Sequence, residues 1–480
     1  MLFNSLDFLI FFPIVVGLYY AMPARYRWLM LLGASYYFYM CWKAEYIILI
    51  VLSTLIDYGV SLKMSSIEEK KKRLPCLLIS LCANLGLLFF FKYWTFFSSN
   101  TQAVLDQLNI FYDLPAFDLL LPVGISFYTF QTLSYSIDIY QGKIQPERHL
   151  GRFALYVSFF PQLVAGPIER ASRLLPQFHQ TFQFDYHRVV GGVQQMMWGM
   201  FKKVVIADRL AAYVTEIYAL PAEENGLALL IATYFFAFQI YCDFSGYSDI
   251  AIGAARVLGY DLMDNFRTPY LAASVREFWA RWHISLSTWF RDYVYIPLGG
   301  NRVRTGRWFA NLMIVFVVSG FWHGANWTFI VWGALHGAYL IAEILAKRWN
   351  LFHLNWLAPR LRRGVMILTT FHLTLLAWVF FRANNLQDAW TILSSIIQLP
   401  LSLTLAMIKE TVIGAGGLSW GISCMILLGF ILLDPILDQR IKGLKANQRI
   451  PAARLVFASL TSLILLCGYF GKVEFIYFQF

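Results

Sequence analysis

His323 lies in the stretch FWHGANW (321–327), whose flanks VFVVSG and TFIVWGAL have the composition of a membrane-buried segment. A neutral imidazole has a pKa of about 6.5 and can take a proton from a hydroxyl that attacks an acyl group. A thioester is already activated, so one base can suffice without a serine or cysteine nucleophile. His323 is therefore either a catalytic base for acyl transfer or a packed polar residue between helices.

Two polar residues follow His323 closely in the sequence. On one continuous helix over 310–338, His323, Asn326 and Trp327 would share a face, and Asn326 could orient the imidazole by a hydrogen bond. At about 1.5 Å and 100° per residue, His336 would lie about 20 Å along the axis and turned away. We therefore expect His323 and His336 not to form a pair.

A second histidine, His283, lies in EFWARWHISLSTWFRDYVYIPLGGNR (277–302). On a helix, Trp279, His283 and Ser287 repeat every four residues and share one face. Aromatic residues beside basic ones are typical of a helix at the membrane surface. That interpretation leaves His283 unexplained.

The charged residues of this stretch have spacings that favour local pairing. Glu277 and Arg281 are four residues apart and are expected to form an ion pair. Arg291 follows, and Pro297 with the glycines at 299–300 is expected to end the element.

A third polar stretch is QIYCDFSGYSDIAIG (239–253), with Asp243, Ser245 and Asp249 in an apolar setting. Ionisable groups at membrane depth usually face a cavity or a partner. These side chains either line a substrate tunnel or form hydrogen bonds between helices that approach closely at glycines.

Other kinds of catalytic site find little support. No second histidine lies within four residues of His323, so a zinc site is not expected. GLSWG (417–421) matches the nucleophile motif G-x-S-x-G but lacks the strand–turn–helix context that the motif needs. We expect no metal and no bound cofactor.

The composition indicates a membrane protein. The 480 residues are 59% hydrophobic and only 14% charged, whereas soluble domains are about 25% charged. Lipid must therefore solvate most of the chain, and we expect an all-α polytopic membrane protein. The net charge of +11 comes from basic residues in short loops, where they set topology, so nucleic acid is not an expected partner.

Apolar runs of about 20 residues predict about eleven membrane-spanning helices. The expected spans begin near residues 5, 28, 44, 76, 118, 226, 308, 325, 364, 420 and 453. Shorter pieces at 150–166, 189–208, 247–260 and 386–400 are expected to be re-entrant or interfacial.

The loops predict the orientation. The basic segment 63–75 should be cytoplasmic, and 98–117, which has no Lys or Arg, should lie outside, as should Met1. No linker divides the chain, so we expect one membrane domain over 1–480, with N-terminal spans in 1–140 and the motif-bearing region in 150–480.

Several stretches together resemble the membrane-bound O-acyltransferase family. They are LVAGPIER (163–170), QIYCDFSGYSDIAIG, NFRTPY (265–270), the 277–302 stretch, VSGFWHGANWTFIVWGALHG (318–337), WVFFRA (378–383) and FIYFQF (475–480). The resemblance runs from residue 163 to the end and is nearest to the branch that serves alginate O-acetylation.

The resemblance implies a ring of helices around a central tunnel, with re-entrant helices lining it. The two signature histidines of the family map onto His283 and His323, and the second is the catalytic one, as a base or as a transient carrier of the acetyl group. His283 would line the tunnel and position the donor or tune His323. The further candidates for the tunnel lining are Asp243, Ser245, Ser287, Arg291, Trp322 and Asn326.

The function implied is transfer of acetyl from cytoplasmic acetyl-CoA across a bacterial inner membrane to an exported polysaccharide, most simply alginate. A separate periplasmic acyltransferase would complete the transfer, and membrane lipid would surround the chain. Peptidoglycan or cellulose are alternative acceptors. Two other classes of protein are alternatives. One is a transporter for polar solutes that uses Asp243 and Asp249, and the other is a non-catalytic scaffold for secretion.

Overall fold

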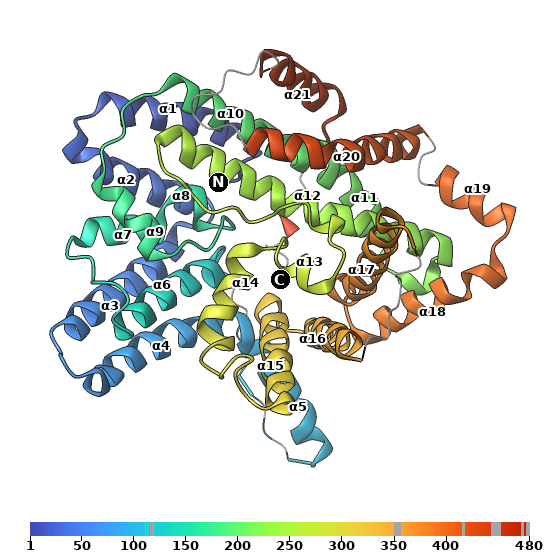
Figure 1. Ribbon diagram of the computed structural model, residues 1–480, viewed down its shortest axis with the longest axis horizontal. Helices are drawn as coiled ribbons and strands as arrows, with labels where there is room; N and C mark the ends of the chain where they lie inside the picture. The colour runs from blue at the N-terminus through green and yellow to red at the C-terminus, as the bar shows by residue number, and fades with distance from the viewer. Residues whose placement is uncertain are drawn as a thin grey trace. The chain divides into compact units, whose positions relative to one another are not determined.

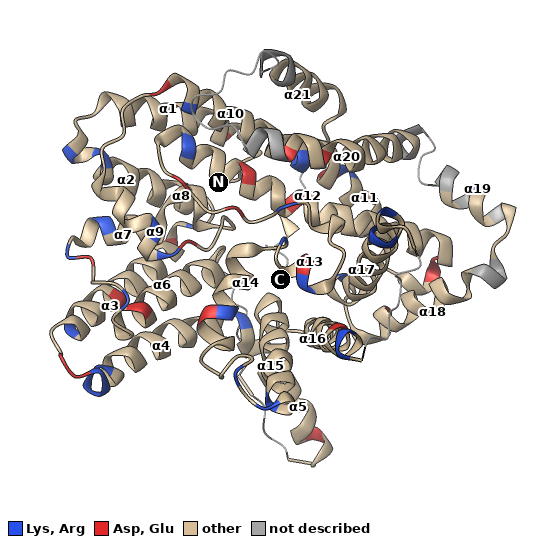
Figure 2. Cartoon of the chain, in the orientation of Figure 1, with Lys and Arg blue, Asp and Glu red and all other residues tan. Residues whose placement is uncertain are grey.

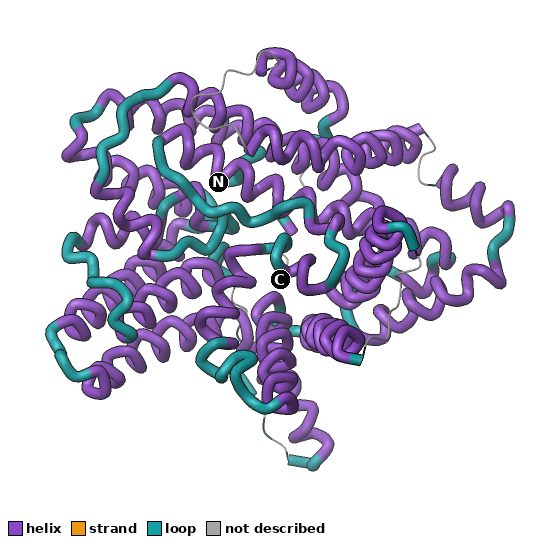
Figure 3. The backbone as a smooth tube through the Cα atoms, viewed as in Figure 1, coloured by secondary structure: helices purple, strands orange, loops and turns teal. Residues whose placement is uncertain are grey.

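The computed structural model covers 480 residues and describes all of them except 111, 113, 116, 118–119, 350–356, 415–417, 443–452, 472–474 and 477–480. Within the described residues every regular element is helical, as Figure 3 shows, so the all-α prediction is confirmed. The chain divides into two compact units. Unit 1 comprises Met1–Val193 and Ile250–Met263, and unit 2 comprises Gln194–Asp249 and Asp264–Phe480. One membrane domain over 1–480 stays a prediction.

Six helical segments of the described chain are long and apolar enough to cross a membrane. They are Ala44–Ser65, Lys70–Gln107, Gly226–Leu258, Trp327–Arg348, Pro359–Arg382 and Gly421–Asp438. Charged residues are sparse along the ribbon (Figure 2). The multi-pass prediction is confirmed, whereas the number of about eleven spans stays a prediction.

Unit 1 begins with helices joined by short connections. They are α1 (Leu6–Ala21), α2 (Arg27–Met40), α3 (Ile47–Ser65), α4 (Leu74–Leu88), the π-helix Phe89–Tyr93 and α5 (Trp94–Gln107). The side chain of Ser5 caps α1 by accepting from the Phe8 N–H. Helix α6 (Ile125–Tyr140) packs against α3 and α4 and is buried over nearly its whole length.

Polar side chains meet where α3, α4 and α6 pack. Asp57 accepts hydrogen bonds from Ser80, from Asn84 at 2.8 Å and from Ser136 at 3.2 Å. The Ser53 hydroxyl donates to the side-chain Oδ1 of Asn84 at 2.7 Å. This set, the Asp57 cluster, is buried and bridges three helices, so its hydrogen bonds hold unit 1 together.

The expected short pieces are present in part. The segment 150–166 forms α7 (Leu150–Ser158) and α8 (Phe160–Leu163), and 189–208 falls in α10 (Tyr186–Met200) and a π-helix, Phe201–Ala207. The segment 386–400 lies in α18 (Leu386–Ser402). The remaining short helix of unit 1 is α9 (Ala171–Leu174).

The segment 247–260 is not a separate piece, and that prediction is wrong. It continues α12, one helix from Gly226 to Leu258. Gly246 does not break this helix. A Cβ there would lie 2.7 Å from the Gly199 carbonyl oxygen, so the glycine lets α10 approach α12 closely.

The other helices of unit 2 are labelled in Figure 1. They are α11 (Asp208–Ile217), α13 (Val275–Trp279), α14 (Ile284–Phe290), α15 (Thr305–His323), α16 (Trp327–Arg348), α17 (Pro359–Arg382), α18, α19 (Leu405–Gly414), α20 (Leu418–Lys442) and α21 (Ala453–Cys467). Helix α20 begins within GLSWG, and residues 477–480 of the terminal FIYFQF motif lie outside the described residues.

Helices α15 and α16 form a tight hairpin. Gly324 and Ala325 separate them, and Asn326 caps α16. A Cβ on Gly320 would lie 2.2 Å from the Phe329 carbonyl oxygen, and one on Gly333 would lie 2.2 Å from that of Phe316. Separate helices at the spans expected near 308 and 325 are confirmed, and a single helix over 310–338 is excluded.

Candidate active site

His323 is the last residue of α15 and is 3% exposed. Three aromatic rings surround its imidazole. The ring centroids of Trp322, Trp332 and Phe381 lie 4.9, 5.0 and 5.3 Å from it, with the planes at 75°, 84° and 70°. These rings come from α15, α16 and α17, so three helices define the position of His323.

Asn326 does not orient His323, so that prediction is wrong. Its side-chain oxygen accepts from the Thr328 N–H at 3.0 Å, and its amide nitrogen donates to the Asn384 carbonyl at 3.0 Å. The first N–H groups of a helix lack intrahelical partners, and a residue such as Asn satisfies one of them. Because the Asn326 side chain caps α16, it does not orient the imidazole of His323.

His336 is much closer to His323 than the single-helix argument predicts. The Trp332 ring lies 5.0 Å from His323 and 5.0 Å from His336, so both imidazoles contact the same indole. The prediction of a separation of about 20 Å is wrong because the chain reverses at Gly324.

His336 lies in an aromatic enclosure. The rings of Trp279, Tyr339 and Phe278 lie 4.9, 5.8 and 6.1 Å from its imidazole. Both of its ring nitrogens are buried without a hydrogen-bond partner among the described residues, and so are Trp279 Nε1, Trp332 Nε1 and Tyr339 Oη. We call Trp279, Trp332, His336 and Tyr339 the Trp332 cluster.

His283 is fully buried and has a left-handed backbone, with φ of 43° directly before α14. Asn265 Oδ1 lies 3.1 Å from its Nδ1 and also accepts from the Ser285 N–H at 3.2 Å. Because that oxygen can only accept, Nδ1 carries the proton. Burial lowers the pKa of His283 to about 3, so the imidazole is neutral near pH 7.

Trp322 connects the two predicted histidines. Its ring lies 4.9 Å from that of His323 and 6.3 Å from that of His283. Phe244 from α12 also places its ring at 4.6 Å from His283 and at 89° to it. The structure therefore brings His283, Trp322 and His323 together within unit 2, in line with what the resemblance implies.

The 277–302 stretch is not one helix. It forms α13, then a turn through His283, then α14 and a π-helix, Arg291–Tyr295. The predicted common face of Trp279, His283 and Ser287 is therefore wrong. The Ser287 hydroxyl donates to the Trp282 carbonyl at 3.2 Å instead.

The charged residues of this stretch largely follow expectation. Glu277 and Arg281 form the predicted ion pair at 2.6 Å. Arg291 pairs with Asp292 at 2.8 Å, and its side chain is 59% exposed. A turn with positive φ at Gly299 and Gly300 ends the element as predicted.

Asp243 and Asp249 are paired inside unit 2. Lys203 lies 2.8 Å from Asp243 and 2.7 Å from Asp208, and Lys202 forms a buried pair with Asp249. Asp243 also accepts from the Ile476 N–H at 2.8 Å. These contacts favour the helix-joining interpretation over a tunnel lining.

Ser245 is also buried, and its hydroxyl has no hydrogen-bond partner within the described part of the chain. Lys202 and Lys203 were not predicted from the sequence, although two lysines in an apolar stretch are a signal of buried charge. Asn265 and Trp332 were not predicted either, because they carry no charge and lie in stretches with more conspicuous residues.

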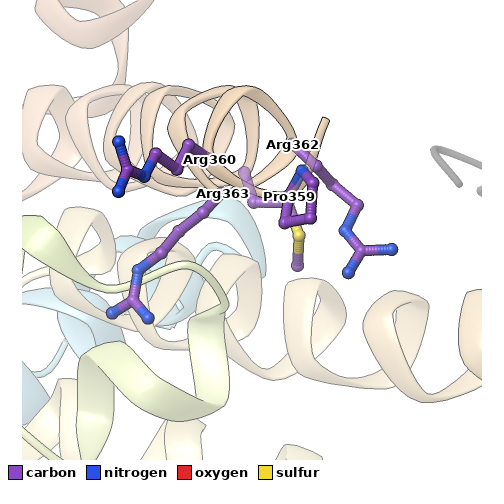
Figure 4. A pocket seen from close by; sticks show the side chains of 5 residues that line it. Pro359, Arg360, Arg362 and Arg363 are labelled. Atoms are coloured by element: carbon purple, nitrogen blue, oxygen red, sulfur yellow. The ribbon is translucent and has the colours of Figure 1, made fainter. Parts of the chain in front are cut away.

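A separate hollow of about 440 Å³ lies at the start of α17 (Figure 4). Pro359, Arg360, Arg362, Arg363 and Met366 line it. Arg363 lies 4.0 Å from Glu277 of α13. From Arg360 to Phe381, beside His323, the helix rises about 32 Å, so this basic hollow is distinct from the histidine site. No group of three His, Cys, Asp or Glu that could hold a metal occurs among the described residues.

Comparisons with known proteins bear on this site. A model of the membrane-bound O-acyltransferase family matches residues 147–386, which include both histidines. The probable alginate O-acetylase AlgI of Azotobacter vinelandii is 42% identical over 393 residues, covering 81% of this chain and 77% of the relative. The peptidoglycan O-acetyltransferase of Helicobacter pylori is 37% identical over 399 residues, 78% and 73% of the two chains. The teichoic acid D-alanyltransferase of Bacillus subtilis is 27% identical over 280 residues, 56% and 70% of the two chains.

Proposed function

Because this chain belongs to the membrane-bound O-acyltransferase family, we propose that it moves acetyl from cytoplasmic acetyl-CoA across the membrane for O-acetylation of an exported polysaccharide. Membership of this family identifies the chain as an O-acyltransferase, and its apolar helices are long enough to cross a membrane several times. The observation that carries the proposal is the buried contact of His283 and His323 with one indole, Trp322.

His323 acts as the general base. Its imidazole takes the proton of the acceptor hydroxyl while the hydroxyl oxygen attacks the thioester carbonyl carbon. When the carbon–sulfur bond breaks, the imidazolium returns this proton to the CoA thiolate. The products are an acetyl ester and free CoA thiol, and His323 is neutral again.

His283 is a positioning residue in this scheme. Its Nδ1–H is held by Asn265, which fixes the ring, and the ring in turn contacts Trp322 beside the base. A neutral imidazole at this point adds no positive charge that would disfavour protonation of His323.

The basic residues of unit 2 support a cytoplasmic donor. Arg304 and Arg307 lie at the start of α15, and Lys347 and Arg348 lie at the end of α16, so they share the open end of the hairpin. Basic residues favour the cytoplasmic side. From Thr305 to His323 the helix rises about 27 Å, most of the apolar thickness of a bilayer.

We further propose that this membrane is a bacterial inner membrane, with Met1 on the periplasmic side. A separate periplasmic acyltransferase would then receive the acetyl group and esterify the glycan. Alginate is the proposed acceptor, because the probable alginate O-acetylase of Azotobacter vinelandii is 42% identical to this chain and the peptidoglycan O-acetyltransferase of Helicobacter pylori 37%. Peptidoglycan and cellulose are the alternative acceptors, and their hydroxyls would be acetylated by the same reaction.

The test uses the full chain in liposomes with acetyl-CoA labelled in the acetyl group. Wild-type protein should release CoA thiol and transfer label when acceptor is present, and His323→Ala should lower this rate at least about 10³-fold. His372→Ala is the control, since His372 is exposed on α17 and bonds Tyr234. Stable label on isolated wild-type protein that His323→Ala abolishes would make His323 an acyl carrier instead of a base.

A wild-type protein inert towards acetyl-CoA would overturn the enzymatic proposal. Solute flux in the same liposomes would then favour the transporter, and inertness in both assays would favour the scaffold. The pairing of Asp243 and Asp249 with lysines gives the transporter little support.

A further inference from the structure

The Trp332 cluster contains several buried polar atoms without partners. Trp279 Nε1, Trp332 Nε1, both nitrogens of His336 and Tyr339 Oη have no hydrogen-bond partner in the described part of the structure. Leaving such a group unpaired inside a protein costs about 1–3 kcal/mol. Native proteins keep few of these groups, and those that persist often serve a ligand or a reaction.

Trp332 differs from the other members in its position. Its ring lies 5.0 Å from the proposed base His323, and it is 0% exposed. The rings of Trp279 and Tyr339 instead contact His336. Any acyl group that reacts at His323 must therefore come close to the Trp332 indole.

We propose that the Trp332 indole N–H is the oxyanion donor of the acyl transfer. This inference rests on the proposed function, because it needs a thioester carbonyl beside His323. The N–H is a donor only, it is buried, and it has no acceptor in the described structure. Donors held in place before the reaction and aimed at developing charge are among the largest contributions to enzyme catalysis.

The donor acts in the step that forms the tetrahedral intermediate. The acceptor oxygen bonds to the carbonyl carbon, His323 takes the hydroxyl proton, and the carbonyl π electrons move onto the carbonyl oxygen. That oxyanion accepts a hydrogen bond from Trp332 Nε1–H. When the carbonyl re-forms, the carbon–sulfur bond breaks, the thiolate takes the proton from His323, and Trp332 keeps its own proton throughout.

The surrounding rings keep this indole in place. Phe381 lies 5.2 Å from the Trp332 ring, Trp279 lies 5.7 Å from it, and His336 lies 5.0 Å from it. A ring enclosed in this way loses little freedom when the oxyanion forms, and the apolar walls strengthen the hydrogen bond.

The test compares two tryptophans that stack on each other. Trp332 and Trp378 lie 5.9 Å apart at 20°, but the Trp378 N–H already donates to Tyr270 at 3.2 Å. Trp332→Phe should lower kcat for CoA release about 10²–10³-fold with a small change in KM. Trp378→Phe should change kcat only a few-fold.

A third protein carries 3-benzothienylalanine at position 332, which keeps the shape of the indole and replaces its N–H by sulfur. It should show the same loss of kcat as Trp332→Phe, with the amount of folded protein checked by size-exclusion chromatography. Wild-type kcat in this protein, or equal losses in the two phenylalanine variants, would overturn the proposal. An inactive wild type, or an active His323→Ala, would instead overturn the proposed function.

Discussion

The Asp57 cluster of unit 1 and the Trp332 cluster of unit 2 are both buried polar sites in a membrane protein, yet they differ in their hydrogen bonds. Asp57 accepts from three side chains on two neighbouring helices. The Trp332 cluster instead contains polar atoms without a partner among the described residues. A saturated cluster can only hold helices together, whereas an unsaturated one has capacity left for a substrate.

Whether the polar atoms have hydrogen-bond partners is a better guide to the role of each cluster than the types of residue in it. A carboxylate in an apolar helix is the stronger sequence signal of function, but here its hydrogen bonds are used internally. An indole in an apolar helix is a weak sequence signal, but here its buried N–H has no partner among the described residues and its ring lies 5.0 Å from that of His323. Substitutions in the two clusters should therefore separate stability from activity.

The largest expected effect on stability is at Asp57. Asp57→Ala leaves the donors of Ser80, Asn84 and Ser136 without this acceptor, so the free energy of unfolding should fall by about 3 kcal/mol. Thermal unfolding in detergent measures this loss. The protein that remains folded should keep wild-type kcat.

Ser136→Ala is the matched variant at the edge of the same cluster, and it should cost only about 1 kcal/mol because one hydrogen bond is lost. If Asp57→Ala lowered kcat while leaving stability intact, the Asp57 cluster would belong to the reaction and the comparison would fail.

His283 is intermediate between the two clusters, because one nitrogen is hydrogen bonded and the whole ring is buried. The unfolded chain protonates this histidine below about pH 6.5, whereas the folded protein keeps it neutral to about pH 3. The unfolded state then binds more protons, so stability should fall as the pH drops below 6.5. At pH 5 the loss is about 2 kcal/mol.

His283→Asn removes the titrating group and suits the left-handed backbone, which Asn tolerates better than most residues. Unfolding measured at pH 7 and pH 5 should show a smaller difference for this variant than for wild type. An equal difference in both proteins would mean that another group causes the acid sensitivity. The variant should also show a severe loss of activity.

The smallest effect is expected at His336. His336→Phe replaces two unpartnered nitrogens by carbon and keeps a ring among Phe278, Trp279 and Trp332. Exchanging a buried unpaired polar group for an apolar one of similar shape is neutral or stabilising. The melting temperature should stay constant or rise, and a loss above about 2 kcal/mol would show that His336 has a partner that holds the fold.

The sequence was sufficient for the class of fold, because the apolar composition required helices. The motifs that resemble the family pointed to His283 and His323, and the structure places both rings near Trp322, while their catalytic roles stay a prediction. The pairing of Glu277 with Arg281 followed from the four-residue spacing, although α13 ends at Trp279 and Arg281 lies in the turn after it.

Other features depended on where helices end. Whether Gly324 breaks a helix or Gly246 continues one is decided by packing, since glycine permits both. The contact of His323 with Trp332 depends on the reversal of the chain at Gly324, and helical periodicity does not predict such a reversal. The Asp57 cluster was missed although its aspartate interrupts an apolar run, and its saturation became visible only with Ser80 and Asn84 in place.

The hairpin of α15 and α16 has a consequence for how the enzyme can change. Gly320 precedes His323 by three residues, and Gly333 directly follows Trp332. At both positions one added carbon would meet a backbone oxygen of the other helix at 2.2 Å. Any larger residue would push the helices apart and move His323 away from the Trp332 indole. The absence of a side chain at these two glycines thus sets the spacing of the proposed reaction centre, and variation in this enzyme must avoid both positions.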